Sequence, residues 1–267
     1  MDTRAIGVLD SGIGGLTSAK VLEEILPRED IVYFGDSRRM PYGGHTGEEI
    51  REMSLQGAAF LESFNVKAIL LACGTISSNA TDTLRAHFTT PFIGVVDAAC
   101  AAAARCTKTK KVGVIATPPS VASGVYQRGL GELDEDITVL TRACENFAEM
   151  VEQGHFRVGD GIAEREVARE LDCFRGSGID TLLLGCTHYP LLGGVIAAFL
   201  GGHVRQISAG VEAAYALREY LNGNGMLTDS PGPGRRRWYT SGDTEVFGSS
   251  ADMFLGHHIV PEQRILG

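Results

Sequence analysis

Two cysteines of the chain lie where short apolar runs end. Cys73 closes "AILLAC" (68–73) and Cys186 closes "DTLLLGC" (180–186), and a polar turn follows each of them. An apolar run of this length predicts a buried strand, so the thiol is placed where the chain leaves the core. A thiol between a strand end and a helix start lies near partial positive charge, which favours the thiolate. These two positions therefore indicate reactivity rather than packing.

Two thiols on opposite sides of one carbon atom would define a proton-transfer reaction. An unperturbed thiol has a pKa of about 8.5, so it exchanges a proton near neutral pH at modest cost. A thiolate on one face removes a proton from the carbon while a thiol on the other face donates one, which inverts the stereocentre. This scheme requires no cofactor. It does require neighbouring acids or bases and anchors for the charged ends of a substrate.

A structural role is the alternative interpretation, because free cysteine is among the most buried residue types. For Cys73 or Cys186 alone both interpretations stay open, whereas the pair at equivalent strand ends favours function. No cysteine pair has CxxC spacing, so the sequence predicts neither a zinc site nor a redox pair. The remaining cysteines lie in helical or ordinary patterns and are interpreted as structural; they are Cys100, Cys106, Cys144 and Cys173.

The elements that position these thiols alternate between apolar runs and helical patterns. Apolar runs without polar alternation predict strands buried on both faces, hence parallel sheets covered by helices in an α/β architecture. The expected strands are 5–10, 30–36, 68–73, 92–97, 111–117, 137–140, 180–186 and 203–208. A Pro- and Gly-rich stretch at 221–237 predicts a surface loop, and the segment after it predicts a strand and a final amphipathic helix.

A weak internal repeat indicates two similar lobes. "VKAILLACGTISS" resembles "IDTLLLGCTHYPLL", and "IGVLDSG" resembles "VGVIATPPS". In open α/β sheets ligands bind beyond the carboxyl ends of the strands, so each lobe would offer its strand ends to a shared cleft. Those ends carry Asp10, Ser11, Cys73, Thr75, Thr117, Cys186, Thr187 and His188.

Two Gly-containing segments predict anion-binding backbone. "DSGIGGLT" (10–17) fits neither GxGxxG nor GxxxxGK[ST], but Gly12, Gly14 and Gly15 can expose N–H groups at a helix start to a carboxylate or a phosphate. Asp10 is either a helix cap or a charged partner for a substrate ammonium or for Cys73. "MPYGG" (40–44) predicts a turn whose tyrosine and amides can bind a carboxylate.

Composition excludes several classes of protein. The formal net charge of -9 argues against a general nucleic-acid or membrane-surface binder. The start "MDTRAIGVLDSG" has no signal-peptide pattern, and no apolar run approaches the roughly 20 residues that span a bilayer. We therefore expect a cytoplasmic protein with reduced thiols.

Taken together, these motifs resemble the glutamate racemases of bacteria. "GVLDSGIGGLT", "YFGDSRRMPYG", "ACGT", "GCTHYPLL" and "YTSGDTEVF" carry the resemblance, which runs from Ile6 to about Phe254. It implies a small-molecule isomerase that supplies D-glutamate for peptidoglycan without a cofactor or a metal. It also implies two pseudo-symmetric α/β lobes with the active site between them, commonly assembled as a homodimer. The lobes would be residues 1–97 plus 208–267, and residues 98–207.

The resemblance also implies roles for individual residues. Cys73 would act on the face where D-glutamate is deprotonated, and Cys186 on the face where L-glutamate is deprotonated. Asp10 would assist the first thiol, whereas His188 and Glu152 would assist the second. The residues implied to hold the substrate are Asp10, Ser11, Tyr42, Gly43, Gly74, Thr75, Thr117 and Thr187.

The chain departs from the family pattern at two places. Gly74 replaces the asparagine of the usual Ala-Cys-Asn-Thr, which removes about one hydrogen bond to a bound amino acid, or about 0.5–1.5 kcal/mol. "CENFAEM", before Glu152, lacks the usual prolines. Three alternatives stay open: a racemase or epimerase for aspartate, a related enzyme for another substrate such as a hydantoin, and a non-catalytic binder or regulator, for example of DNA gyrase.

Overall fold

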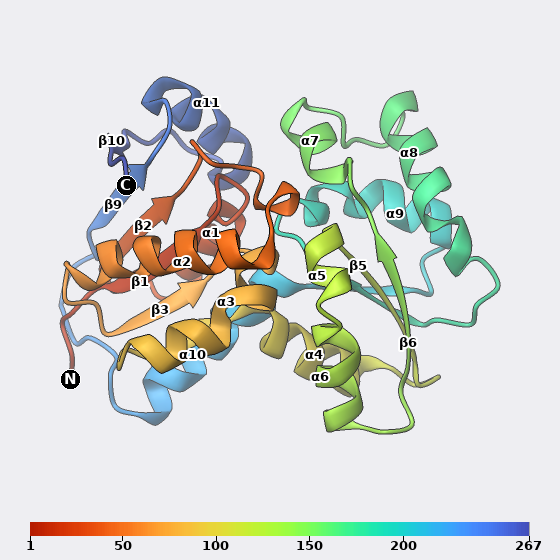
Figure 1. Ribbon diagram of the computed structural model, residues 1–267, viewed down its shortest axis with the longest axis horizontal. Helices are drawn as coiled ribbons and strands as arrows, with labels where there is room; N and C mark the ends of the chain where they lie inside the picture. Colours follow the sequence, from red (N-terminus) through yellow and green to blue (C-terminus); the bar gives the residue numbers. More distant parts are fainter. Residues whose placement is uncertain (267) are drawn as a thin grey trace.

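Two parallel sheets form the framework of the molecule. The computed structural model describes residues 1–266 and contains a six-stranded sheet, β10-β9-β2-β1-β3-β4, and a four-stranded sheet, β6-β5-β7-β8. Every recorded strand pair is parallel. Figure 1 shows the sheets side by side in separate lobes, with both chain ends in the lobe of the larger sheet.

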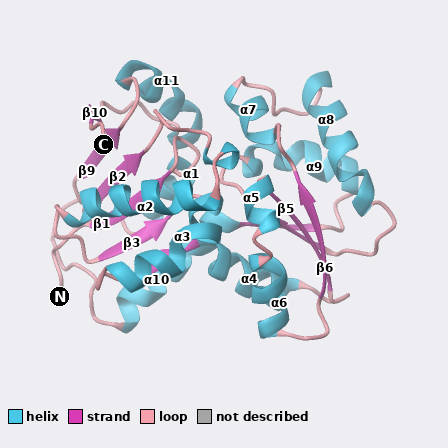
Figure 2. Cartoon of the chain, in the orientation of Figure 1, coloured by secondary structure: helices cyan, strands magenta, loops and turns pink. Residues whose placement is uncertain are grey.

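Helices flank both sheets, as Figure 2 shows. The strands are β1 (Ile6–Asp10), β2 (Ile31–Gly35), β3 (Ala68–Leu71), β4 (Phe92–Gly94), β5 (Lys111–Ala116), β6 (Thr138–Ala143), β7 (Thr181–Leu184), β8 (Arg205–Ser208), β9 (Arg236–Thr240) and β10 (Glu262–Gln263). The α-helices are α1 (Leu16–Ile25), α2 (Gly47–Glu62), α3 (Gly74–His87), α4 (Val95–Cys106), α5 (Pro118–Ala122), α6 (Val125–Leu133), α7 (Phe147–Glu152), α8 (Gly161–Leu171), α9 (Gly193–Leu200), α10 (Ala209–Gly223) and α11 (Thr244–Leu255). Short 3₁₀ turns are η1 (Tyr42–Gly44), η2 (Asp172–Phe174) and η3 (Tyr189–Leu192).

The apolar runs form strands because both faces of each sheet are covered. In β1, Val8 belongs to one buried cluster and Leu9 to another, and in β2 Tyr33 and Phe34 divide in the same way. Successive strand residues point to opposite faces, so a strand between two helical layers needs apolar side chains throughout. The predicted α/β architecture is confirmed.

The internal repeat corresponds to a repeated strand order. The series β2-β1-β3-β4 in the first sheet matches β6-β5-β7-β8 in the second. The similar segments of the sequence therefore occupy equivalent strands: β1 and β5 form one pair, and β3 and β7 form the other. In each sheet the chain adds a strand on one side of the first strand (β2 beside β1, β6 beside β5) and then crosses to the other side (β3, β7). Open α/β sheets bind ligands at this change of direction. Cys73 follows β3 and Cys186 follows β7, so both thiols lie there.

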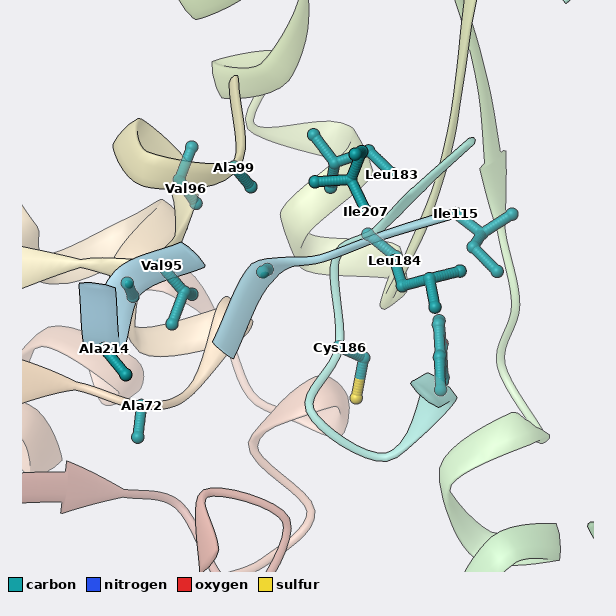
Figure 3. Close-up of a cluster of buried hydrophobic side chains, with 14 of the residues drawn as sticks. Ala72, Val95, Val96, Ala99, Ile115, Leu183, Leu184, Cys186, Ile207 and Ala214 are labelled. Atoms are coloured by element: carbon teal, nitrogen blue, oxygen red, sulfur yellow. The ribbon is translucent and has the colours of Figure 1, made fainter. Parts of the chain in front are cut away.

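Two helices connect the lobes and pack against each other. The chain enters the four-stranded sheet through α4 and leaves it through α10, and these helices are in contact. One buried apolar cluster consequently runs through both lobes. Figure 3 shows part of it, with Ala72 of the first lobe, Leu184 of the second and Cys186 among its members.

Some predicted segment boundaries are wrong. The expected strand 92–97 ends at Gly94, because the Val96 N–H donates to Ser77 Oγ at 3.2 Å and α4 begins at Val95. The expected loop 221–237 is shorter at both ends, since α10 continues to Gly223 and β9 begins at Arg236.

Candidate active site

A cavity of about 310 Å³ lies between the two lobes. Its volume falls at the lower end of the range of small-molecule sites. Strand ends β1, β3, β5 and β7, the turn 40–44 and the segment 145–152 supply its walls. The predicted site residues that line it are Ser11, Tyr42, Gly43, Cys73, Gly74, Thr75, Thr117, Glu152, Cys186, Thr187 and His188.

Cys73 reaches the cavity from the first lobe as the N-cap of α3. Its Sγ accepts the N–H of Ile76 at 3.5 Å and lies 3.2 Å from the hydroxyl oxygen of Ser11. Burial and then the charge of Asp10 raise the pKa of the Cys73 thiol to about 12, although the Ser11 and Ile76 contacts favour the thiolate. Without substrate, this sulfur is therefore a protonated acid at neutral pH.

Asp10 lies beneath the cavity and is absent from its described lining. The side chain is 2% exposed, and its Oδ2 accepts the N–H groups of Gly12 and Gly15 at 3.2 and 2.9 Å. The Tyr33 hydroxyl also donates to Oδ2, at 3.0 Å. Burial raises the pKa of Asp10, opposed by the Gly15 N–H and the positive charge of His188. Asp10 thus acts on Cys73 through its field, and it holds the glycine loop in place.

This arrangement corrects the prediction for the glycine segment. The N–H groups of Gly12 and Gly15 are not free for a ligand, because the internal carboxylate of Asp10 occupies them. The prediction that these N–H groups bind a negative group at the start of α1 still holds. That group belongs to the protein.

Cys186 reaches the cavity from the second lobe and contacts a histidine–carboxylate pair. Its Sγ lies 3.6 Å from His188 Nδ1, and His188 Nε2 lies 2.8 Å from Glu152 Oε1. Burial alone would lower the pKa of His188, but the contacts with Cys186 and Glu152 outweigh it and raise that pKa to about 10. At neutral pH the imidazole is therefore a cation that lies between Cys186 Sγ and the Glu152 carboxylate.

Hydroxyl groups meet across the cavity. Thr75 Oγ1 of the first lobe lies 2.9 Å from Thr117 Oγ1 of the second, and Thr117 Oγ1 donates to Ser120 Oγ at 3.0 Å. At another point Thr17 Oγ1 lies 3.3 Å from the carbonyl oxygen of Thr187. These contacts link the walls that carry the two thiols.

Tyr42 and Gly43 lie on the wall formed by η1. The Tyr42 hydroxyl donates to Asp36 Oδ2 at 2.5 Å, so this phenol is engaged in the protein interior and is not free for a ligand. The first N–H groups of a helical turn have no acceptor within that turn. The backbone at Tyr42 and Gly43 is consequently the part of this wall suited to a carboxylate.

Several site residues escaped the sequence analysis. Glu145, Asn146 and Glu149 line the cavity, and Tyr33 fixes Asp10 from the middle of β2. The expected strand 137–140 actually continues to Ala143. The strand end therefore lies three residues later than predicted, and the polar residues that follow it were not recognised as strand-end residues. Nothing in the local sequence distinguishes Tyr33 from other buried strand residues.

The described residues 1–266 contain no group of three or more His, Cys, Asp or Glu side chains arranged to hold a metal ion. Within the same residues no helix combines the length and apolar character that crossing a membrane requires.

The fold and the cavity define a class of protein: two-lobed α/β proteins in which one thiol from each lobe lines a shared cavity. The chain belongs to the Asp/Glu/hydantoin racemase family, whose profile matches residues 15–216.

The relatives within this family narrow the comparison. Glutamate racemase 2 of Caldanaerobacter subterraneus subsp. tengcongensis is 38% identical over 259 residues, which cover 97% of this chain and 96% of the relative. A solved glutamate racemase isoform of Bacillus anthracis superimposes with a TM-score of 0.94 at 37% identity, covering 99% of this chain and 98% of that one. A glutamate racemase of Francisella tularensis in complex with D-glutamate gives a TM-score of 0.92 at 36% identity, covering 100% of this chain and 98% of that one.

Proposed function

We propose that this protein interconverts L- and D-glutamate by proton transfer at Cα and thereby supplies D-glutamate for peptidoglycan. The observation that carries the proposal is the position of Cys73 and Cys186, which line one cavity from different lobes. The similarity to glutamate racemases over nearly the whole chain supports glutamate as the substrate.

The two thiols divide the reaction between them. For L-glutamate, the Cys186 thiolate takes the Cα proton, and the electron pair left on Cα delocalises into the adjacent carboxyl group. The Cys73 thiol then donates its proton to the opposite face of Cα, which gives D-glutamate. The proton lost from Cα stays on Cys186 and the proton gained comes from Cys73, so no net proton is consumed. Loss of a proton from Cys186 to solvent and uptake of one by Cys73 restore the starting state, and the reverse reaction exchanges the roles of the two thiols.

The neighbouring groups assist each thiol differently. His188, held by Glu152, contacts the Cys186 sulfur directly and is placed to exchange a proton with it. Ser11 contacts the Cys73 sulfur directly, and burial together with the field of Asp10 keeps that thiol protonated until substrate arrives. When the substrate ammonium group enters, its positive charge offsets Asp10 and lowers the cost of forming a Cys73 thiolate.

Neutral groups hold the substrate in this scheme. The described lining of the cavity includes no lysine or arginine, so the substrate carboxylates are bound by N–H and hydroxyl donors. Thr187 supplies a hydroxyl, and the Tyr42–Gly43 backbone supplies N–H groups. The hydroxyls of Thr75 and Thr117, which contact each other and Ser120 without substrate, would turn towards it when it binds. Short fixed donors of this kind discriminate carboxylate positions without the flexibility of a long cationic side chain.

The proposal extends to the organisation of the molecule. We assign residues 1–97 plus 208–267 to one lobe and residues 98–207 to the other, in line with the strands that each sheet contains. The resemblance supports a cytoplasmic homodimer whose reaction proceeds on amino-acid side chains alone.

Solvent exchange in D2O tests the proposed function. Incubation with L-glutamate and, separately, with D-glutamate is expected to replace the Cα proton by deuterium and to produce the other enantiomer in both cases. NMR follows the exchange and polarimetry follows the inversion. Exchange with aspartate but not with glutamate would show that aspartate, not glutamate, is the substrate. Absence of exchange with every amino acid, while both thiols are reduced, would contradict an enzymatic function.

A further inference from the structure

Gly74 lies at a backbone contact between the two thiol-bearing segments. It follows Cys73 directly and begins α3, whereas Gly185 precedes Cys186 in the other lobe. A Cβ atom placed on Gly74 would lie 2.0 Å from the carbonyl oxygen of Gly185 and 3.8 Å from the Cα of Cys186. The two segments therefore approach as closely as they do only because residue 74 has no side chain.

The Gly185 carbonyl has little freedom to move away. Its oxygen accepts the hydroxyl of Tyr126, a fully buried side chain, at 3.2 Å. The N–H of the same residue donates to the Ile115 carbonyl at 2.7 Å. The space on the other side of Gly185 is also occupied, because a Cβ there would lie 2.5 Å from the Tyr126 hydroxyl oxygen. Accommodation of a side chain at 74 would thus require the lobes to separate.

We propose that Gly74 is a positioning residue that sets the separation of the two thiols. Any side chain at this position, asparagine included, would move the Cys73 segment from the Cys186 segment by about 1 Å. A displacement of that size in a two-base reaction costs about 100-fold in rate. This inference rests on the proposed racemisation. It predicts that the packing of this chain requires glycine at position 74, and that Gly74→Asn lowers the activity.

The test compares Gly74→Ala and Gly74→Asn with Gly131→Ala. Gly131 lies in α6, and a Cβ there would meet no heavy atom within 4 Å. Both alanine substitutions add a helix-favouring methyl group, so their difference isolates the contact with Gly185. For both Gly74 variants we expect kcat to fall about 100-fold with a smaller change in KM, while Gly131→Ala retains the activity of the unsubstituted protein.

The ratio of Cα deuterium exchange to inversion separates a positioning role from general damage. If the thiols are too far apart, one thiol still removes the proton, but donation from the opposite face slows. The ratio is therefore expected to rise in Gly74→Ala, and a crystal structure of that variant is expected to show a longer Cys73 Sγ to Cys186 Sγ distance. Unfolding alone would lower both rates together.

A second variant covers the case in which Gly74→Ala does not fold. Tyr126→Phe adds no atom and releases the Gly185 carbonyl from its donor, so it is expected to raise the same ratio by a smaller amount. The inference is overturned if Gly74→Asn inverts glutamate as fast as the unsubstituted protein or faster, or if the ratio stays unchanged in the folded variants. Inactivity of the unsubstituted protein would instead overturn the proposed function, and this role of Gly74 with it.

Discussion

His188 couples the Cys186 thiol to the Glu152 carboxylate, and this coupling has a consequence for stability. The pKa of His188 is raised from 6.5 to about 10 in the folded protein. A raised pKa means that folding favours the protonated imidazole. Its stabilising effect is fully present below pH 6.5, where the unfolded chain is also protonated, and it is lost as the pH rises towards 10.

We predict that Glu152→Gln weakens the loss of stability between pH 6.5 and pH 10. The amide keeps the size of the carboxylate but removes the charge that helps to hold the proton on His188. Thermal unfolding of both proteins at several pH values checks this. The unsubstituted protein should lose at least 2–4 °C more than the variant across that range, about the shift produced by 1 kcal/mol in a chain of this size.

Comparing the unsubstituted protein with Glu152→Gln cancels the contribution of other histidines to the pH dependence of stability. The pKa of His257 is also raised, by its hydrogen bond with Glu23, but this group is present in both proteins. Parallel stability curves for the two proteins would contradict the assignment of a charged His188–Glu152 pair.

At the scale of elements, the glycine loop 10–17 forms a contact surface for the other lobe. A Cβ on Gly14 would lie 2.4 Å from His188 Nδ1 and 2.5 Å from Thr187 Oγ1. The start of α1 therefore packs directly against the segment that contains Thr187 and His188. A glycine is required here by the approach of another element, not by an unusual backbone angle.

We predict that Gly14→Ala impairs the Cys186 side of the reaction. The methyl group would displace His188, and the loss of a positioned acid–base group costs about 100-fold or more. The measurement is the initial rate of Cα exchange with L-glutamate. Gly223→Ala, at a position where a Cβ meets nothing within 4 Å, serves as the control. Equal exchange rates in the two variants would show that the contact of Gly14 with His188 has no role in the reaction.

The sequence predicted the strands and the strand-end residues because these follow from local patterns. Apolar runs located β1, β3, β5 and β7, and the internal repeat located the two lobes. The use of the Gly12 and Gly15 N–H groups by Asp10 was not predictable, since the same loop serves a bound anion or an internal carboxylate equally well.

Contacts between distant segments were also outside the reach of local patterns. The role of Tyr33 depends on its hydroxyl reaching from β2 to Asp10 on the neighbouring strand β1. The contact between Gly74 and Gly185 depends on how the lobes are packed. The sequence shows that Gly74 departs from the family motif, but its contact with Gly185, which gives a physical reason for glycine there, is visible only in the structure.

At the scale of the whole molecule, the repeated lobes place chemically different surroundings around two similar thiols. One lobe surrounds Cys73 with Ser11 and the field of Asp10, and the other surrounds Cys186 with His188 and Glu152. Two packed helices, α4 and α10, hold the lobes together. We propose that each lobe supplies one base and that inversion requires both.

The most direct test is Cα exchange in D2O by Cys73→Ser and Cys186→Ser, measured separately with each enantiomer. Inversion should fall at least about 1,000-fold in both variants, within the range that a positioned acid–base group contributes. Any residual exchange should be one-sided, with D-glutamate favoured by Cys186→Ser and L-glutamate favoured by Cys73→Ser. Inversion that survives in either variant at a rate near that of the unsubstituted protein would contradict the two-thiol account.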